Sequence, residues 1–185
     1  MLCGTGLLLI STLVSKTKTS ATECETTFSG LKEDEALKIS GCCTGIIDRA
    51  YESGHDYEEE HGGCCRCTVA ALQSALDFLP DSRELFRAAS CLDGGATPTG
   101  LQNCGAFTGA GMFIGWICGI ERFRNTRLSH KLIRQVFHRF QDAYGGVLCK
   151  DVRKSLGGDC PEAVGRASKW TIEAILHQFA GYERK

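Results

Sequence analysis

The chain has 185 residues, of which 43% are hydrophobic, and its formal net charge at pH 7 is -1. This length suffices for one domain with a hydrophobic core, and the apolar content is typical of a globular protein. The near-zero charge gives no electrostatic basis for nucleic-acid binding, so we expect no nucleic-acid partner. Cysteine is unusually frequent, with 12 residues, and includes adjacent pairs such as Cys42-Cys43. Adjacent cysteines fit a simple disulfide framework poorly, so thiol chemistry and metal binding compete with disulfide stabilisation as their role.

The first 30 residues contain an apolar run, Leu7 to Val14, followed by the small residues Thr19-Ser20-Ala21. This order resembles a secretory signal peptide, although no basic residue precedes the run. We expect residues 1–30 to be a signal peptide or a disordered tail, and residues 31–185 to form one helical, cysteine-rich redox domain. Export to the periplasm is favoured over a cytoplasmic location. The run is too short for a normal membrane span.

Apolar residues recur at helical spacing along the rest of the chain, which predicts an all-α, single-domain bundle of about five to six helices. The expected helices are 33–53, 64–79, 82–92, 104–120, 128–144 and 160–179, with a turn or short helix near 147–152. Gly54 is expected to end the first helix, and the acidic run Asp56 to Glu60 to form a solvated loop. The helix 104–120 is apolar on all sides and rich in glycine. It is expected to be buried at the centre of the bundle, where its glycines let other helices approach closely; a membrane span is the less favoured interpretation.

Several cysteines lie where helices are expected to begin. The peptide dipoles at a helix N-terminus stabilise a thiolate, so we expect Cys104 to have a lowered pKa. Cys64 and Cys67 have C-x-x-C spacing, which places two thiols on one helical turn. For each cysteine the alternative role is that of a small buried apolar side chain. The candidates are Cys64, Cys67, Cys104, Cys149 and Cys160.

The chain resembles the redox-active proteins named for their C…GCAxxG…C…C cysteine pattern. The segment Cys104-Gly105-Ala106-Phe107-Thr108-Gly109 resembles the CGAxxG core of that pattern. Upstream, Cys67 to Leu72 resembles the start of the family's first-cysteine helix. Downstream, Phe140 to Val152 resembles its Phe…Tyr-Gly…Cys segment, and Cys160 resembles its last cysteine. The resemblance covers about residues 33–179.

Carried over residue by residue, the resemblance implies a site made of Cys67, Cys104, Cys149 and Cys160. Cys64 is a rival for the first position, because some members of the family read Gly-Gly-Cys there and this chain has Gly62-Gly63-Cys64. Some relatives carry haem attached through C-x-x-C-H. Here Cys67 is followed by Thr68, so no covalent c-type haem is expected.

Three functions remain open from the sequence. The first is thiol–disulfide exchange or electron transfer with a redox partner protein, with Cys104 as the activated thiolate. The protein would then be an oxidoreductase or an electron-transfer protein. The second is a zinc or iron–sulfur site held by Cys67, Cys104, Cys149 and Cys160. His61 lies near this set, but a solvated histidine beside the Glu run is favoured over a ligand. The third is an exported helical binding domain stabilised by disulfides.

Overall fold

The computed structural model describes residues 28, 30–39, 42–96, 98–120 and 127–183. Within these residues the protein is all-helical and has no strand, as predicted. An isolated antiparallel bridge joins Asn103 to Leu148. The expected signal segment falls largely outside the described residues. The helices are α1 (Cys43–His61), α2 (Cys64–Ala75), α3 (Arg83–Ala88), α4 (Gly105–Cys118), α5 (Arg127–Tyr144), α6 (Cys149–Ser155) and α7 (Cys160–Ala180), with a short 3-10 turn at Ala89–Cys91.

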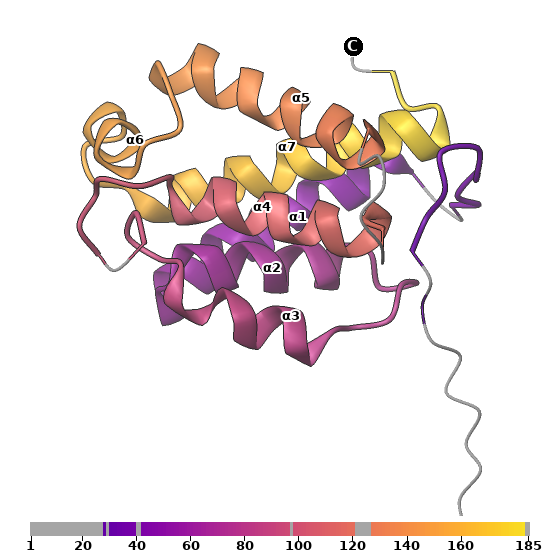
Figure 1. Ribbon diagram of the computed structural model, residues 1–185, viewed down its shortest axis with the longest axis horizontal. Helices are drawn as coiled ribbons and strands as arrows, with labels where there is room; N and C mark the ends of the chain where they lie inside the picture. Colours follow the sequence, from indigo (N-terminus) through magenta and orange to yellow (C-terminus); the bar gives the residue numbers. More distant parts are fainter. Residues whose placement is uncertain (1–27, 29, 40–41, 97, 121–126, 184–185) are drawn as a thin grey trace, which may run out of the picture.

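The helices pack against one another, and α1, α2, α4, α5 and α7 lie side by side (Figure 1). Helix α7 contacts α1, α2, α4 and α5, and its most extensive contact is with α1. Helix α4 contacts α2, α3, α5 and α7. Helix α6 lies at one end of the bundle, close to the starts of α4 and α7 (Figure 1). No helix in the described part of the chain has both the length and the apolarity required to cross a membrane.

The first helix differs from its predicted range at both ends. It begins at Cys43 rather than near residue 33, and it continues through Gly54 to His61. A Cβ on Gly54 would lie 2.8 Å from Ser168 Oγ and 3.0 Å from the Val164 carbonyl oxygen. This glycine therefore permits the close packing of α1 against α7 and does not end the helix. The prediction of a loop over residues 56–60 is wrong, since these residues belong to α1.

Residues 30–39 form a non-helical segment that packs on the helices. The Leu31 N–H donates to the Ile117 carbonyl at 2.5 Å, and the Leu37 N–H donates to the Phe179 carbonyl at 2.8 Å. Leu31 itself is buried in the core. These contacts give the last turns of α4 and α7 backbone partners that a helix end otherwise lacks.

The remaining predicted helices are observed with small shifts at their ends. Helix α2 ends at Ala75 rather than near residue 79, and α3 is shorter than predicted because its last turn is a 3-10 turn. The Ser82 side chain caps α3 and accepts the Leu85 N–H at 3.1 Å. Helix α7 begins as expected, with the Asp159 side chain accepting the Glu162 N–H at 3.1 Å. The short segment near 147–152 is the helix α6.

Candidate functional site: a pocket lined by four cysteines

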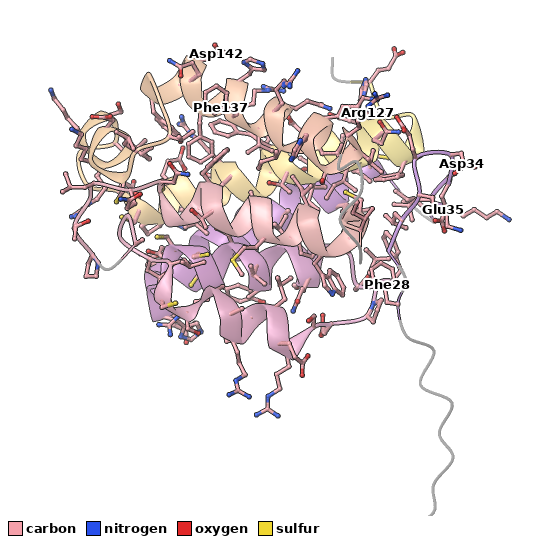
Figure 2. The ribbon with its side chains drawn as sticks, viewed as in Figure 1. Phe28, Asp34, Glu35, Arg127, Phe137 and Asp142 are labelled. Atoms are coloured by element: carbon pink, nitrogen blue, oxygen red, sulfur yellow. The ribbon has the colours of Figure 1, made fainter. Side chains whose placement is uncertain are left out.

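A pocket of about 210 Å³ lies at the end of the bundle where several helices begin, and four cysteines line it. We call it the four-cysteine pocket. Sulfur atoms are visible at this end of the molecule, near α6 (Figure 2). The four cysteines are Cys64, Cys104, Cys149 and Cys160. The other residues that line the pocket are Glu58, Gly63, Asp93, Gly94, Pro98, Arg153, Asp159 and Ala163.

Each of the four cysteines stands at the beginning of a different helix. Cys64, Cys149 and Cys160 are the first residues of α2, α6 and α7, and Cys104 is the residue immediately before α4. The positive ends of four helix dipoles therefore lie at this end of the bundle. At Cys104, the backbone N–H groups of Ala106 and Phe107 act on the thiol and favour its ionised form.

Two short backbone contacts hold the segments of Cys104 and Cys149 together. The Cys104 N–H donates to the Val147 carbonyl at 2.7 Å. The Cys149 N–H donates to the Gln102 carbonyl at 2.9 Å. These bonds flank the bridge between residues 103 and 148, so the starts of α4 and α6 are fixed relative to each other.

Glycines of α4 allow α2 to approach the pocket closely. A Cβ on Gly105 would collide with Cys64 Sγ and would lie 3.0 Å from the Cys65 nitrogen. One turn further along α4, a Cβ on Gly109 would lie 2.5 Å from the Cys65 carbonyl oxygen. The two glycines thus bring Cys64 of α2 next to the start of α4, where Cys104 lies.

The expectation of a low pKa for Cys104 is wrong. Burial raises the pKa of the Cys104 thiol to about 12, and the nearby Cys64 opposes its ionisation further. The hydrogen bonds from the start of α4 lower this pKa, as expected, but desolvation is the larger effect. Burial likewise raises the pKa of Cys64 to about 12 and raises the pKa values of Cys149 and Cys160. As free groups these thiols are protonated at neutral pH.

Charged side chains of both signs act on the pocket cysteines, and Glu58 disfavours ionisation of both Cys64 and Cys160. Glu58 of α1 and Asp93 of the loop before α4 disfavour ionisation of Cys64. Burial raises the pKa of Glu58 to about 6. Arg153 of α6 acts in the opposite sense and lowers the pKa values of Cys149 and Cys160, although burial outweighs it. Arg153 is the only cation among the described residues that line the pocket.

Cys67 does not line the four-cysteine pocket. Its Sγ donates to the Gly62 carbonyl at 3.2 Å and to the Tyr57 carbonyl at 3.4 Å. It also interacts with the carboxyl group of Glu58, a residue that lines the pocket. The structure therefore brings Cys64 together with Cys104, Cys149 and Cys160, and it places Cys67 outside this set.

The remaining cysteines in the described residues lie elsewhere. Cys65 is fully buried, and its Sγ contacts Met112 Sδ at 3.8 Å. Cys118 is buried and donates to the Ile114 carbonyl at 3.0 Å. Each described cysteine is a free thiol; the set is Cys42, Cys43, Cys64, Cys65, Cys67, Cys91, Cys104, Cys118, Cys149 and Cys160.

The spacing of the pocket sulfurs bears on which metal centre could bind there. No three of the four sulfurs lie within 4.8 Å of one another. A single zinc ion binds thiolates at about 2.3 Å in a tetrahedron, which places its sulfurs roughly 3.8 Å apart. The pocket as it stands is therefore too open for a mononuclear zinc site.

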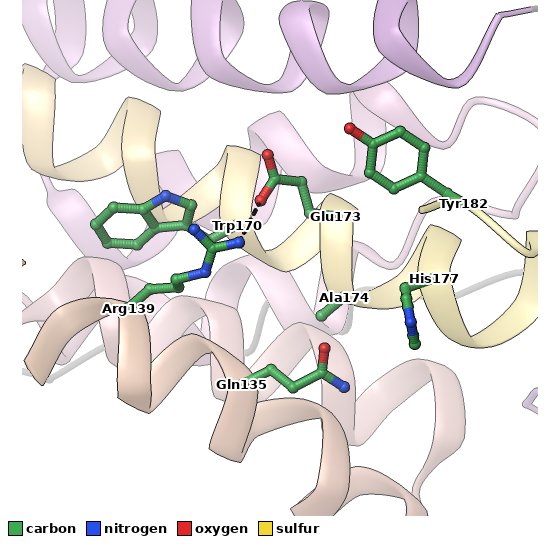
Figure 3. Close-up of a pocket in the computed structure, with 7 residues that line it drawn as sticks. All are labelled: Gln135, Arg139, Trp170, Glu173, Ala174, His177 and Tyr182. Carbon is green, nitrogen blue, oxygen red and sulfur yellow. Dashed lines mark hydrogen bonds and ion pairs between the residues drawn. The ribbon is translucent and has the colours of Figure 1, made fainter. Parts of the chain in front are cut away.

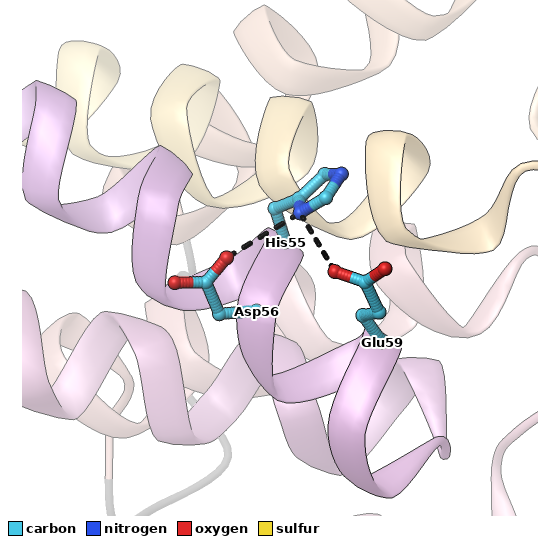
Figure 4. Close-up of side chains that lie close together, drawn as sticks. All are labelled: His55, Asp56 and Glu59. Carbon is cyan, nitrogen blue, oxygen red and sulfur yellow. Dashed lines mark ion pairs between the residues drawn. The ribbon is translucent and has the colours of Figure 1, made fainter.

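A second group of metal-ligating side chains occurs on α1. His55 Nδ1 lies 3.5 Å from an Asp56 carboxylate oxygen and 3.9 Å from one of Glu59 (Figure 4). Both carboxylates are exposed, and these contacts are surface ion pairs of the ordinary kind. His61 is also exposed, lies 3.8 Å from Glu60, and does not line the four-cysteine pocket.

A smaller pocket of about 70 Å³ lies between α5 and α7 (Figure 3). Trp170 and Tyr182 form part of its wall. Arg139 and Glu173 also line it and form an ion pair at 3.1 Å across it (Figure 3). The carboxylate in this pocket is thus neutralised by its own neighbour, and no cysteine contributes to the lining.

Four charged residues of the four-cysteine pocket had not been predicted as part of a site: Glu58, Asp93, Arg153 and Asp159. Glu58 had been assigned to a solvated loop. Asp93 was part of a turn-rich loop, yet its Oδ1 accepts the Cys65 N–H at 2.7 Å and so caps α2 from a distant segment. Only for Asp159 was a sequence signal available, because the Asp-Cys-Pro-Glu order is typical of a helix start.

The fold and the pocket define a class of small, all-helical, cysteine-rich proteins whose helix-start cysteines face a common pocket. The family described as "Putative redox-active protein (C_GCAxxG_C_C)" matches residues 62–174, which is more than half of the chain. The chain belongs to this family. The matched region contains all four cysteines of the pocket. Neither the curated proteins nor the solved structures contain a significant match.

Proposed function

We propose that this protein transfers electrons through a centre in the four-cysteine pocket, with Cys64, Cys104, Cys149 and Cys160 as the ligands of an iron–sulfur cluster. The observation that carries the proposal is that these four cysteines, from the starts of four helices, line one pocket. In this assignment Cys64, rather than Cys67, is the first cysteine of the family pattern. Helix α4 would be the central element that presents Cys104 to the other three.

The chemistry of the pocket suits a cluster better than a reactive thiol. The high pKa values of Cys64 and Cys104 keep both groups protonated and therefore poorly nucleophilic. Metal binding removes thiol protons, because the metal charge compensates the buried thiolates. A centre with several metal ions separates its ligands more widely than one ion does, in keeping with sulfurs that are too far apart for zinc. When bound, such a cluster supplies reversible one-electron transfer.

The residues around the sulfurs have defined roles in this proposal. The backbone N–H groups of Ala106 and Phe107 at Cys104, and that of Gly94 at Cys64, stabilise negative charge on sulfur. Hydrogen bonds of this kind raise the reduction potential of thiolate-ligated centres. The burial of Cys64, Cys104 and Cys149 restricts water and oxidants.

A reversible disulfide is the second candidate, and Arg153 is the observation that favours it. Arg153 assists ionisation of the Cys149 and Cys160 thiols, and at Cys160 Glu58 opposes this effect. Joining two thiols as a disulfide releases two protons and two electrons, and these pass to a disulfide of the partner, which becomes a dithiol.

The domain that carries either centre is proposed to be residues 31–185. Export remains the expectation for the full chain.

Iron and acid-labile sulfide analysis of protein purified without oxygen tests the proposal. We expect stoichiometric iron and sulfide, visible absorbance that bleaches on reduction, and loss of both after Cys104→Ser. A colourless, iron-free and fully folded protein would contradict the cluster. In that case, mass mapping without reductant decides the second candidate, because a reversible Cys149–Cys160 disulfide supports it and permanently free thiols exclude it.

A further inference from the structure

Helix α6 borders the four-cysteine pocket and carries three exposed cations. They are Lys150, Arg153 and Lys154, and we call them the α6 edge. None of the three forms a side-chain ion pair or hydrogen bond with another residue in the described part of the chain. Their charges are therefore available to a molecule that approaches this end of the bundle.

The α6 edge lies beside the most accessible sulfur of the pocket. Cys160 is half-buried, whereas Cys64, Cys104 and Cys149 are buried. Arg153 lines the pocket together with Cys160, and its charge acts on both Cys149 and Cys160. Arg153 is therefore the cation of α6 that is both exposed at the surface and part of the pocket lining.

Carboxylates also line the pocket, and they come from α1, from the loop before α4 and from the residue before α7. Glu58 and Asp93 disfavour ionisation of Cys64, and Glu58 also disfavours that of Cys160. Asp159 caps α7 by accepting the Glu162 N–H. The exposed positive charge at this end of the bundle is therefore carried by α6, where the three cations outnumber the one carboxylate of that helix, Asp151.

We propose that the α6 edge is the docking surface for a redox partner protein that presents a cluster of carboxylates, and that electrons enter and leave the four-cysteine pocket beside Cys160. This inference rests on the proposed electron-transfer function. In each event one electron passes between the partner's redox centre and the centre in this pocket, so that one is oxidised as the other is reduced. No bond is formed or broken. Complementary charge fixes the orientation of such partners and increases the rate of their encounter.

The other basic surface of the molecule lies on α5. It consists of Arg127, His130, Lys131, Arg134 and His138, which border a shallow depression of about 540 Å³. None of these residues lines the four-cysteine pocket. A negatively charged molecule bound to α5 would therefore lie away from the sulfurs of the pocket. This makes Arg134 a suitable position for a control substitution.

Small charged oxidants test the α6 edge on the full-length protein. The reduced protein is mixed with ferricyanide, a trianion, or with hexaammineruthenium(III), a trication, and the two rate constants are measured at low ionic strength. A change in midpoint potential shifts both rates in the same direction, so their ratio reports the charge at the site of electron transfer. We expect Arg153→Gln to lower the ferricyanide-to-ruthenium ratio by about threefold to tenfold, because it removes one positive charge beside the exit. The effect should vanish in 0.5 M salt, and Arg134→Gln should leave the ratio unchanged.

A binding measurement gives a readout that does not involve electron transfer. Hexacyanocobaltate(III) is a redox-inert trianion of the same shape as ferricyanide, and isothermal titration measures its affinity. We expect Lys154→Gln and Arg153→Gln each to weaken the binding of hexacyanocobaltate(III), and Arg134→Gln to leave this binding unchanged. An unchanged rate ratio in Arg153→Gln, or a binding site lost only in Arg134→Gln, would overturn the α6 assignment. A reduced wild-type protein that gives no electron to either oxidant would instead contradict the electron-transfer function itself.

Discussion

Cys64 and Cys67 lie three residues apart on α2, and residues at this spacing share one face of a helix. Their sulfurs nevertheless have different neighbours. Cys64 Sγ lies against Gly105 at the start of α4, whereas Cys67 Sγ donates to carbonyl oxygens at the end of α1. The difference arises from tertiary contacts of helices that are distant in sequence. Helical periodicity therefore could not decide between the two residues.

Substitution of these two cysteines tests which of them belongs to the redox centre. We expect Cys64→Ser to reduce the iron and sulfide content about tenfold or more, since loss of a direct ligand should exceed the effect of losing a surrounding contact. Cys67→Ser should keep the content and the visible spectrum of the wild type, because a hydroxyl can also donate to the Gly62 carbonyl. The opposite result would make Cys67 the ligand.

Asp93 is the second residue whose role depends on a distant contact. Its Oδ1 accepts the Cys65 N–H at 2.7 Å, at a helix start where Gly63 provides no side-chain cap. We expect Asp93→Ala to lower the free energy of unfolding by about 1–2 kcal/mol, because an N-terminal donor of α2 loses its partner. Asp93→Asn retains an acceptor oxygen and should cost less. Urea denaturation measures both, and equal losses in the two variants would argue against capping.

At the scale of elements, the packing of α2 on α4 depends on which positions of α4 are occupied by glycine. Gly109 faces α2, and a Cβ there would lie 2.5 Å from the Cys65 carbonyl oxygen and 2.9 Å from Thr68 Cβ. Gly115 belongs to the same helix but has no neighbouring atom within 4 Å of the corresponding Cβ position. Alanine substitution at the two positions should therefore change the free energy of unfolding in opposite directions.

We expect Gly109→Ala to destabilise the protein by about 1–3 kcal/mol through overpacking against the α2 backbone. Gly115→Ala should stabilise it by about 0.5–1 kcal/mol, because alanine is the better helix former at an open position. Thermal and urea unfolding of the two variants measure this difference. If Gly109→Ala were neutral, the close approach of α2 and α4 would be incorrect, and with it the placement of Cys64 beside Cys104.

The elements were largely predictable from the sequence, but their contacts were not. Apolar spacing along residues 128–144 and the Asp-Cys-Pro-Glu order near residue 160 indicate helices through local physics alone. Gly54 was read as a helix end because glycine often ends helices. In the structure it is a contact point with α7, which only the three-dimensional arrangement reveals. For the same reason Arg153 and Glu58 could not be assigned to the pocket before the helices were placed.

The sequence also could not show whether burial or the helix dipole has the larger effect on the pKa of Cys104. The position of Cys104 before α4 could be predicted, as could the stabilising effect of the following N–H groups. The magnitude of desolvation could not, since it depends on how other helices cover the sulfur. This opposing effect reverses the sign of the pKa shift at Cys104.

At the scale of the whole molecule, residues 30–39 connect the ends of α4 and α7. Leu31 contacts α4 through its N–H and buries its side chain in the core. Leu37 donates to the last turn of α7. The folded domain should therefore include residues 30–39, even though they are not helical.

Two shortened chains test this boundary. A chain of residues 42–185 loses the buried Leu31 side chain and both backbone hydrogen bonds. Burial of one leucine contributes about 1.5–3 kcal/mol, and each hydrogen bond about 1 kcal/mol. In urea denaturation we expect the free energy of unfolding to fall by about 3.5–5 kcal/mol relative to a chain of residues 28–185. Equal stability of the two shortened chains would place the start of the domain at α1, and the extended segment would then be a surface attachment.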